Sequence, residues 1–172
     1  MLPELSKYEV ENSWQRAYLD SFIEKGWPSS KNEEWKFTSL SGLFKKPFVL
    51  ASKPEGDTRV NNSVTGEEVH RIVFRNGIFD AKLSDDGSSH VVVSNLFDDD
   101  EALQSLNQYQ LNHHPIFNLT LGVMKSAVLI DVSVAPAGKN PFIDLFFTGG
   151  LFQQSAHPVI MIRVAEEAKV NI

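Results

Sequence analysis

The chain has 172 residues, of which 42% are hydrophobic, so it is long enough to bury a core without disulfides or metal ions. Its formal net charge of -6 argues against nucleic-acid binding, because contacts with phosphates need clustered Lys and Arg. The absence of cysteine excludes disulfides, thiolate zinc sites and cysteine-ligated iron–sulfur clusters on this chain.

The amino-terminal residues carry no sign of a targeting segment. Met1–Leu5 lack the basic stretch and the long apolar run of a secretory signal peptide. The longest apolar runs of the chain are far too short to span a bilayer. We therefore expect a cytoplasmic protein.

The first predicted element is an amphipathic helix over residues 6–25. Large apolar side chains recur near helical spacing with charged residues between them, which is typical of a stripe that faces a core. These apolar residues are Tyr8, Trp14, Tyr18, Phe22 and Ile23. Gly26 suits the left-handed position that closes a helix, and Pro28 cannot continue one.

A second helix is predicted over residues 33–46, and Pro47 ends it. Ser30 and Glu33 have the spacing of a capping box, which would satisfy the free amides of the first turn. Large apolar residues follow at Trp35, Phe37 and Leu40. Two interpretations of this stretch stay open: a structural corner clamped by its aromatic rings, and a surface on which a partner docks.

The chain then changes to the period of a β-strand. Residues 51–58 have the composition of a loop. Asn76–Gly77 between two apolar segments predicts a hairpin in which Val73–Phe74 pair with Ile78–Phe79. The next predicted strand is Val91–Val93.

Two clusters of polar residues suggest metal sites at first sight. Four consecutive acids, Asp98–Glu101, precede an apolar segment and are interpreted as the amino end of a helix, where carboxylates complement the macrodipole. His113 and His114 are adjacent, so their side chains project in different directions and do not naturally face one ion. We therefore predict no metal ligand in either cluster.

Three apolar, β-branched segments make up most of the remaining chain. They are Ala127–Val134, Pro141–Phe147 and Pro158–Val164. Equivalent apolar positions, Val128, Phe142 and Val159, recur at intervals that suit either stacked coils of a β-helix or the strands of a sandwich. In the β-helix interpretation these three residues lie one above another, and an open edge is left near Ile172.

Two groups of residues resemble the SufB/SufD family of iron–sulfur cluster assembly scaffold proteins. The first group is Gly26, Pro28, Lys31–Glu34, Trp35–Thr38 and Leu40. The second group is Leu111–Asn112, Gly122, Val128–Ile130, Pro136–Gly138, Pro141–Leu145 and Ala156–Pro158. Val159 replaces the Arg that usually follows His-Pro in the family, so no role of that Arg is carried over. The resemblance covers most of the chain.

The resemblance implies an α+β chain that forms the amino-terminal portion of a longer protein. It implies a helical region over residues 1–50, a small mixed α/β module over 51–122, and the first coils of a right-handed parallel β-helix over 123–172. It also implies a non-catalytic scaffold subunit that joins the SufB and SufC subunits of the SUF iron–sulfur cluster assembly complex. The residues implicated in cluster assembly belong to the later part of the family's chain, so none is carried onto this one.

No catalytic residue, cofactor-binding residue, metal ligand or cofactor is predicted. The five histidines lie in unrelated contexts, no P-loop sequence occurs, and Gly149–Gly150 is interpreted as a turn. His157 is interpreted as a residue at the start of a strand, with pairing to Glu166 or Glu167 as the alternative. The alternative function is a β-rich carbohydrate-active or cupin-like enzyme fragment, which predicts inward-facing clusters of His and Glu on successive strands.

Overall fold

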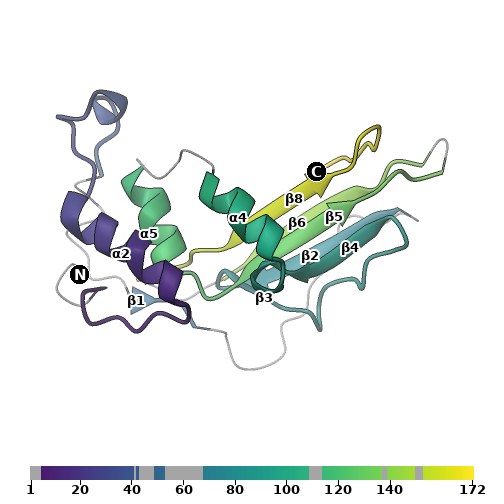
Figure 1. Cartoon of the computed structure of the whole chain (residues 1–172), viewed down its shortest axis with the longest axis horizontal. Helices are drawn as coiled ribbons and strands as arrows, with labels where there is room; N and C mark the ends of the chain where they lie inside the picture. Colours follow the sequence, from purple (N-terminus) through teal and green to yellow (C-terminus); the bar gives the residue numbers. More distant parts are fainter. Residues whose placement is uncertain are drawn as a thin grey trace.

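The chain is a mixed α+β structure. The computed structural model describes residues 5–40, 42, 49–52, 68–108, 114–136, 139–149 and 153–172. The described helices are α2 (Ser13–Lys25), α4 (Asp100–Gln108) and α5 (Pro115–Val123), with the short 3-10 helices η1 (Glu33–Trp35) and η2 (Leu96–Asp98). The described strands are β1 (Val49–Leu50), β2 (Val69–Arg75), β3 (Ile78–Phe79), β4 (Val91–Asn95), β5 (Ala127–Val132), β6 (Phe142–Thr148), β7 (Gln154–Ser155) and β8 (Val159–Val164). In Figure 1 the longer strands run side by side, and α2 and α5 lie beyond one end of them.

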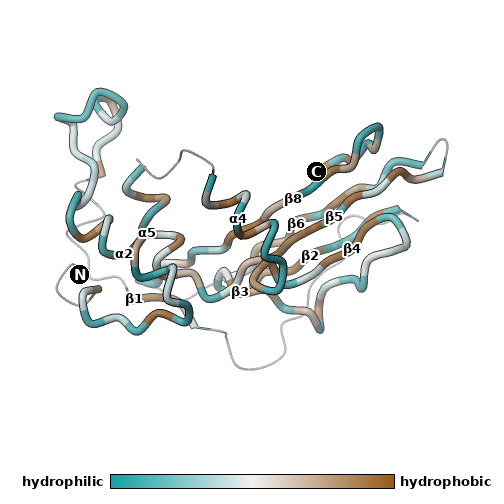
Figure 2. The backbone as a smooth tube through the Cα atoms, in the orientation of Figure 1, coloured by the Kyte–Doolittle hydropathy of each residue, from teal (hydrophilic) through white to brown (hydrophobic). Residues whose placement is uncertain are grey.

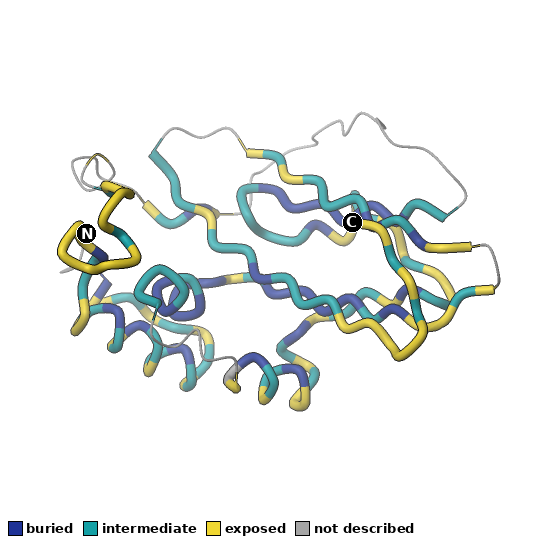
Figure 3. Tube along the Cα trace, turned by 90° about the horizontal axis from the view of Figure 1, so that it is seen from above, coloured by how far each residue is buried: buried dark blue, intermediate teal, exposed yellow. Residues whose placement is uncertain are grey.

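Two three-stranded sheets contribute side chains to a shared core. One sheet has the order β4-β5-β8, and the other has the order β3-β2-β6. The buried residues of this core are Ile72, Phe74, Val91, Val128, Ile130, Val132 and Ile143. Figure 2 shows the hydrophobic residues concentrated along these strands, and Figure 3 shows the buried segments running through the middle of the molecule. Removing such apolar surface from water, at roughly 25 cal/mol per Å², is the main contribution that stabilises a core of this kind.

Strand β5 is buried on both of its faces. Val128 and Ile130 point into the core shared by the two sheets. Ala127 and Leu129, at the alternate positions, belong to a second core formed with η2, α4 and α5. Side chains alternate between the two faces of a strand, so a strand covered on both faces is apolar at nearly every position. This explains the continuous run Ala127–Ile130 in the sequence.

Strand β5 pairs antiparallel with β4, whereas β6 and β8 each pair in parallel with an earlier strand. Strand β8 pairs in parallel with β5, with Ala127 opposite Val159, and β6 pairs in parallel with β2. Asn171, beyond β8, then bridges in parallel to Phe142 at the start of β6. The chain therefore passes from one sheet to the other and back: β6 returns beside β2, and β8 returns beside β5.

The predicted layering of Val128, Phe142 and Val159 is wrong for Phe142. Val128 and Val159 lie in the neighbouring strands β5 and β8 of one sheet, whereas Phe142 lies in β6 of the other sheet, opposite Val69. The shorter interval in the sequence therefore crosses between sheets, and the stacking repeat joins Ala127 to Val159. Apolar residues of both sheets are buried in the same core. Their spacing in the sequence therefore does not show whether two segments pair within one sheet or lie in different sheets.

Helices α2 and α5 pack against each other through a third buried cluster. Its members are Leu5, Leu19, Phe22, Leu119 and Val123. Gly122 allows the close approach, because a Cβ atom at this position would lie 2.8 Å from the Cα and Cβ atoms of Leu19. A substitution at Gly122 would therefore push the two helices apart.

Helix α2 begins later than residue 6, where the sequence placed its start. The backbone amide of Asn12, its N-cap residue, donates to Oε1 of Gln15 at 3.0 Å, so Gln15 fixes the first turn. The predicted end is confirmed: α2 stops at Lys25, and Gly26 follows with a φ of 71°. A positive φ of this kind favours glycine.

The predicted capping box of Ser30 and Glu33 does not form. Asn32 takes its place as the residue before η1, and its Oδ1 accepts hydrogen bonds from the amide and the hydroxyl of Ser29. Within the predicted helix over 33–46, η1 forms a single 3-10 turn, residues 36–40 are not helical, and Gly42 is helical; residues 41 and 43–48 lie outside the described ones. Asn and Ser side chains that bond locally favour such turns over a continuing helix.

The predicted turn at Asn76–Gly77 is confirmed, but the predicted pairing of Val73–Phe74 with Ile78–Phe79 is shifted by one residue, because the two-residue turn places Arg75 opposite Ile78. Phe74 pairs with Phe79 and Arg75 pairs with Ile78 in the antiparallel arrangement. Asn76 and Gly77 have φ values of 51° and 77°, the left-handed conformation that a two-residue hairpin turn requires at both central positions.

Candidate functional site

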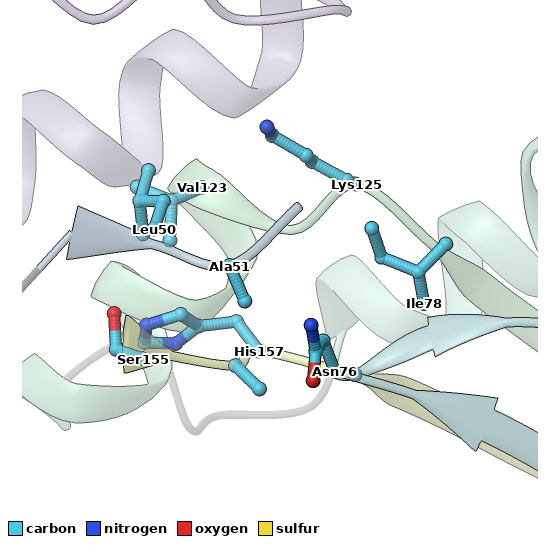
Figure 4. Close-up of a pocket in the computed structure, with 10 residues that line it drawn as sticks. Leu50, Ala51, Asn76, Ile78, Val123, Lys125, Ser155 and His157 are labelled. Carbon is cyan, nitrogen blue, oxygen red and sulfur yellow. The ribbon is translucent and has the colours of Figure 1, made fainter. Parts of the chain in front are cut away.

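A small, partly open cavity lies where the hairpin turn, β1, β7 and α5 converge (Figure 4). Its lining includes Leu50, Asn76, Lys125, Ser155 and His157. The cavity volume is about 10 Å³, which is room for about one water molecule. No substrate of ordinary size fits this space, so we interpret the cavity as a structural junction.

His157 is a residue of this junction whose pKa is shifted. Its Nδ1 lies 3.2 Å from Oγ1 of Thr120 on α5. Burial lowers the pKa of His157 from 6.5 to about 4, because the charged imidazolium loses its hydration. The imidazole is therefore neutral at pH 7, and its polar partner is Thr120 rather than Glu166 or Glu167, which are exposed in the turn after β8.

The acidic run Asp98–Glu101 forms the amino end of α4, as predicted. Oδ1 of Asp99 accepts the amide of Ala102 at 2.8 Å, and this hydrogen bond is the first cause of the lowered pKa of Asp99. Arg163 on β8 donates to Asp99 at 3.0 Å and to Asp131 on β5 at 2.5 Å. Among the residues that the structure describes, no group of three or more His, Cys, Asp or Glu could hold a metal ion.

Of the adjacent residues His113 and His114, the structure describes His114. His113 lies outside the described residues, so its predicted role is not tested. His114 is the N-cap residue of α5, and its ring centroid lies 5.2 Å from that of Trp35. The predicted turn at Gly149–Gly150 is not tested, because Gly150 also lies outside the described residues.

Buried ion pairs lie on the face of the sheet β3-β2-β6 that is turned away from the shared core. Nε of Arg71 donates to Oδ2 of Asp144 at 2.6 Å across β2 and β6, and the guanidinium lies over the ring of Phe146. Arg75 forms a second pair with Asp80 at 2.6 Å. The sequence analysis missed both pairs, although single charges within apolar strand segments were their visible signal. These arrangements are structural, because both arginines are almost completely buried.

The aromatic stretch after α2 does form a packed corner. The ring of Trp27 meets that of Phe22 edge-on, with centroids 5.0 Å apart. Trp35 contacts His114 at the start of α5, so the stretch joins the ends of two helices. Phe37 is the exception, because 93% of its surface is exposed.

Strands β6 and β8 each have an edge available for further pairing, and β3 and β4 are the opposite end strands of the same sheets. Strands β6 and β8 are the last members of their sheets, and within the described ranges the only pairing beyond them is the bridge from Asn171 to Phe142. Phe147 on β6 and Val164 on β8 are among the exposed large apolar residues. An edge of unpaired amides and carbonyls is a template on which another strand can form.

Comparison with known proteins gives one informative similarity. No family model matches the chain. The chain is 29% identical over 163 residues to the iron–sulfur cluster assembly protein SufD of Escherichia coli (strain K12). The match covers 91% of this chain and 37% of that SufD, so the chain spans little more than a third of the length of this relative. In the described part of the chain, none of the helices combines the length and the apolar character needed to cross a membrane.

Proposed function

We propose that this chain is the amino-terminal portion of a SufD-like scaffold subunit, and that it belongs to the SufB/SufD family. The observation that carries the proposal is the similarity to an iron–sulfur cluster assembly protein over nearly the whole of this chain. The proposed role is non-catalytic: the chain supports partner subunits of an assembly complex in the cytoplasm and holds no cofactor of its own.

The stacking of strands supports a scaffold role. Strand β8 lies on β5, and the bridge of Asn171 to Phe142 begins the next layer on β6. We propose that these are the first coils of a parallel β-helix, which would be right-handed because nearly all parallel crossovers are. A coil of this type buries its inner face only when a neighbour stacks on it, so it extends into a stiff support.

The edges of β6 and β8 are the proposed positions for further coils or other subunits. In the SufD-like interpretation the full assembly includes SufB and SufC. A second copy of this chain is the proposed occupant of the edges when no other strand is present. Main-chain pairing of this kind depends little on side-chain identity, so an unfilled edge invites self-association.

The competing interpretation, a carbohydrate-active or cupin-like enzyme fragment, gains no support from a specific observation. It predicts clusters of His and Glu that converge on one cavity. The perturbed histidine found in a cavity, His157, has Thr120 as its partner and a space of about 10 Å³ beside it.

A chimera tests the scaffold proposal. The segment of Escherichia coli SufD that aligns with this chain is replaced by this chain, and the chimera is co-expressed with SufB and SufC. We expect the three proteins to co-purify by affinity capture and gel filtration in the proportions found with unmodified SufD. Loss of both partners from a chimera that is folded by circular dichroism would overturn the proposal.

The control chimera carries Val128→Asp, which places a carboxylate in the core between the sheets. Val128 is 1% exposed, so the change should unfold the inserted region and abolish co-purification. A separate measurement of iron in the purified chain, after gel filtration, should give no stoichiometric metal. Iron retained at a protein site would contradict the non-catalytic, cofactor-free role.

A further inference from the structure

An open groove lies between the segment after α2 and the start of α5. Its volume is about 520 Å³, far larger than the cavity beside His157. We name it the aromatic–acidic groove, and it is lined by Trp27, Glu33, Glu34, Trp35 and Pro115, together with Lys25, Pro28 and Asn32. In Figure 1 the segment that forms one wall projects from the end of α2.

The walls of the aromatic–acidic groove are fixed by packing and local hydrogen bonds. Trp27 rests on Phe22, which is fully buried, and Trp35 rests on His114. Oδ1 of Asn32 accepts the amide of Ser29 at 2.9 Å and closes the turn between the two tryptophans. A groove that is already formed loses little conformational entropy when a ligand binds.

The charges of the groove favour a cation. Glu33 and Glu34 are exposed, and neither carboxylate has an ion pair within the part of the chain that the structure describes. Lys25, the basic residue of the wall, already has an interaction partner. The face of a tryptophan attracts a Lys or Arg side chain, and adjacent carboxylates add to this attraction.

Phe37 follows the groove wall in the sequence and adds an exposed apolar side chain. It lies two positions after Trp35 and is the most exposed of the large hydrophobic residues described, with Nζ of Lys36 at 5.6 Å from its ring centroid. Aromatic residues exposed in this way are enriched at protein interfaces, where they act as anchors.

We propose that the aromatic–acidic groove binds an extended segment of a partner protein that presents Lys or Arg next to an apolar side chain. The cationic group lies over Trp35 between the carboxylates of Glu33 and Glu34, and the apolar neighbour packs against Phe37 and Pro115. Binding here is independent of assembly with SufB and SufC, so its failure and that of the chimera experiment are distinguishable.

The test selects peptides from a random 12-residue phage library on the intact, immobilised chain. The enriched peptides are then labelled with fluorescein and titrated by fluorescence anisotropy. We expect enrichment of Lys or Arg beside an apolar residue. Trp35→Ala and the double variant Glu33→Gln, Glu34→Gln should each weaken binding by about tenfold or more. The matched control is Asp86→Asn, which removes an exposed carboxylate elsewhere, and it should leave binding within about twofold.

Three outcomes would overturn the proposal. The first is no enrichment, or enrichment of acidic peptides. The second is binding that neither groove variant weakens while both remain folded by circular dichroism. The third is a dimer of the chain that Phe37→Ala dissociates, because the groove would then be occupied by a second copy.

Discussion

Nε2 of Gln15 donates a hydrogen bond of 2.9 Å to the backbone oxygen of Met124, which lies at the end of α5. The same nitrogen also lies 3.3 Å from the carbonyl oxygen of Leu121, and Oε1 of Gln15 caps the first turn of α2. One buried amide therefore satisfies backbone groups at the start of one helix and at the end of another. The carbonyl groups that end a helix need such partners when they are buried.

Removal of this amide should loosen the contact between α2 and α5. We expect Gln15→Ala to lower the free energy of unfolding by about 2 to 4 kcal/mol, because buried backbone groups lose their partners. Urea denaturation followed by circular dichroism measures the change. Gln104→Ala, at an exposed position of α4, is the control and should change stability by less than about 0.5 kcal/mol. Equal effects of the two variants would contradict the bridging role of Gln15.

The hairpin turn should tolerate no side chain at Gly77. A Cβ atom there would lie 2.6 Å from the Cβ of Ala156, and the φ of 77° is already unfavourable for other residues. Gly26 also has a positive φ, but a Cβ atom at that position meets nothing within 4 Å. We expect Gly77→Ala to cost about 1 to 3 kcal/mol more than Gly26→Ala, which is the usual penalty of overpacking. Thermal unfolding of the two variants tests this difference.

The free energy of unfolding should fall at acidic pH because of His157. The folded pKa of His157, about 4, lies below the unfolded value of 6.5, so the unfolded state binds the proton first as the pH falls. The stabilising contribution is complete above pH 6.5 and is lost between pH 6.5 and about 4, with about 2 kcal/mol lost by pH 5. Thr120 contacts the ring, and the other polar residues that line the cavity are Asn76, Lys125 and Ser155, of which only the lysine is ionisable.

Comparison of variants isolates this histidine. His157→Gln should reduce the difference in unfolding free energy between pH 7 and pH 5 by about 2 kcal/mol. His90→Gln, in the segment before β4, should leave the difference close to that of the unmodified protein. Urea denaturation of the unmodified protein and the two variants at both pH values gives the six unfolding free energies required. A pH dependence unchanged in His157→Gln would show that other groups carry it.

The pair of Arg71 and Asp144 should be sensitive to the loss of one partner. Asp144→Ala removes the carboxylate that pairs with Arg71, which is 5% exposed, and should cost about 3 to 5 kcal/mol. Replacement of both residues by apolar ones, Arg71→Met with Asp144→Leu, should recover most of that loss. The control is Glu68→Gln at the exposed pair with Lys139, which should cost less than about 1 kcal/mol. A double variant as unstable as Asp144→Ala would contradict this account.

The open edges should cause self-association at high concentration. Phe147 on the edge strand β6 is 53% exposed, and a lysine there should disfavour pairing with another copy. We expect light scattering to show association of the unmodified chain that Phe147→Lys reduces. Val134→Lys, at a residue 54% exposed after β5, should not reduce it. A strict monomer at every concentration would remove the support for edge pairing.

Local features of the sequence predicted those elements whose causes are local. The hairpin at Asn76–Gly77, the helix end at Gly26 and the helix start at Asp98–Glu101 follow from the backbone conformations and charges that these residues favour. The strand segments after residue 126 were also predicted, because burial on both faces leaves a continuous apolar run. The division into regions 1–50, 51–122 and 123–172 stays a prediction.

Part of the candidate site could also be predicted from local features of the sequence. The residue types of the stretch from Trp27 to Phe37 indicated either a corner or a docking surface. The groove itself also needs Pro115, and its wall needs His114 beneath Trp35, both from a distant part of the chain. No periodicity in the sequence links these residues.

The positions of the turns and of the apolar strands follow from the amino-acid sequence, because hydrogen bonding and steric preference act between neighbours. The pairing of the strands depends on the three-dimensional packing: Phe142 lies opposite Val69 of β2 in one sheet, and Val159 lies opposite Ala127 in the other. Apolar residues of both sheets gain similar free energy from the shared core, so the pattern of hydrophobicity does not rank their pairings. The register of β6 on β2 places Asp144 opposite Arg71, and the buried ion pair of these two residues fits that register.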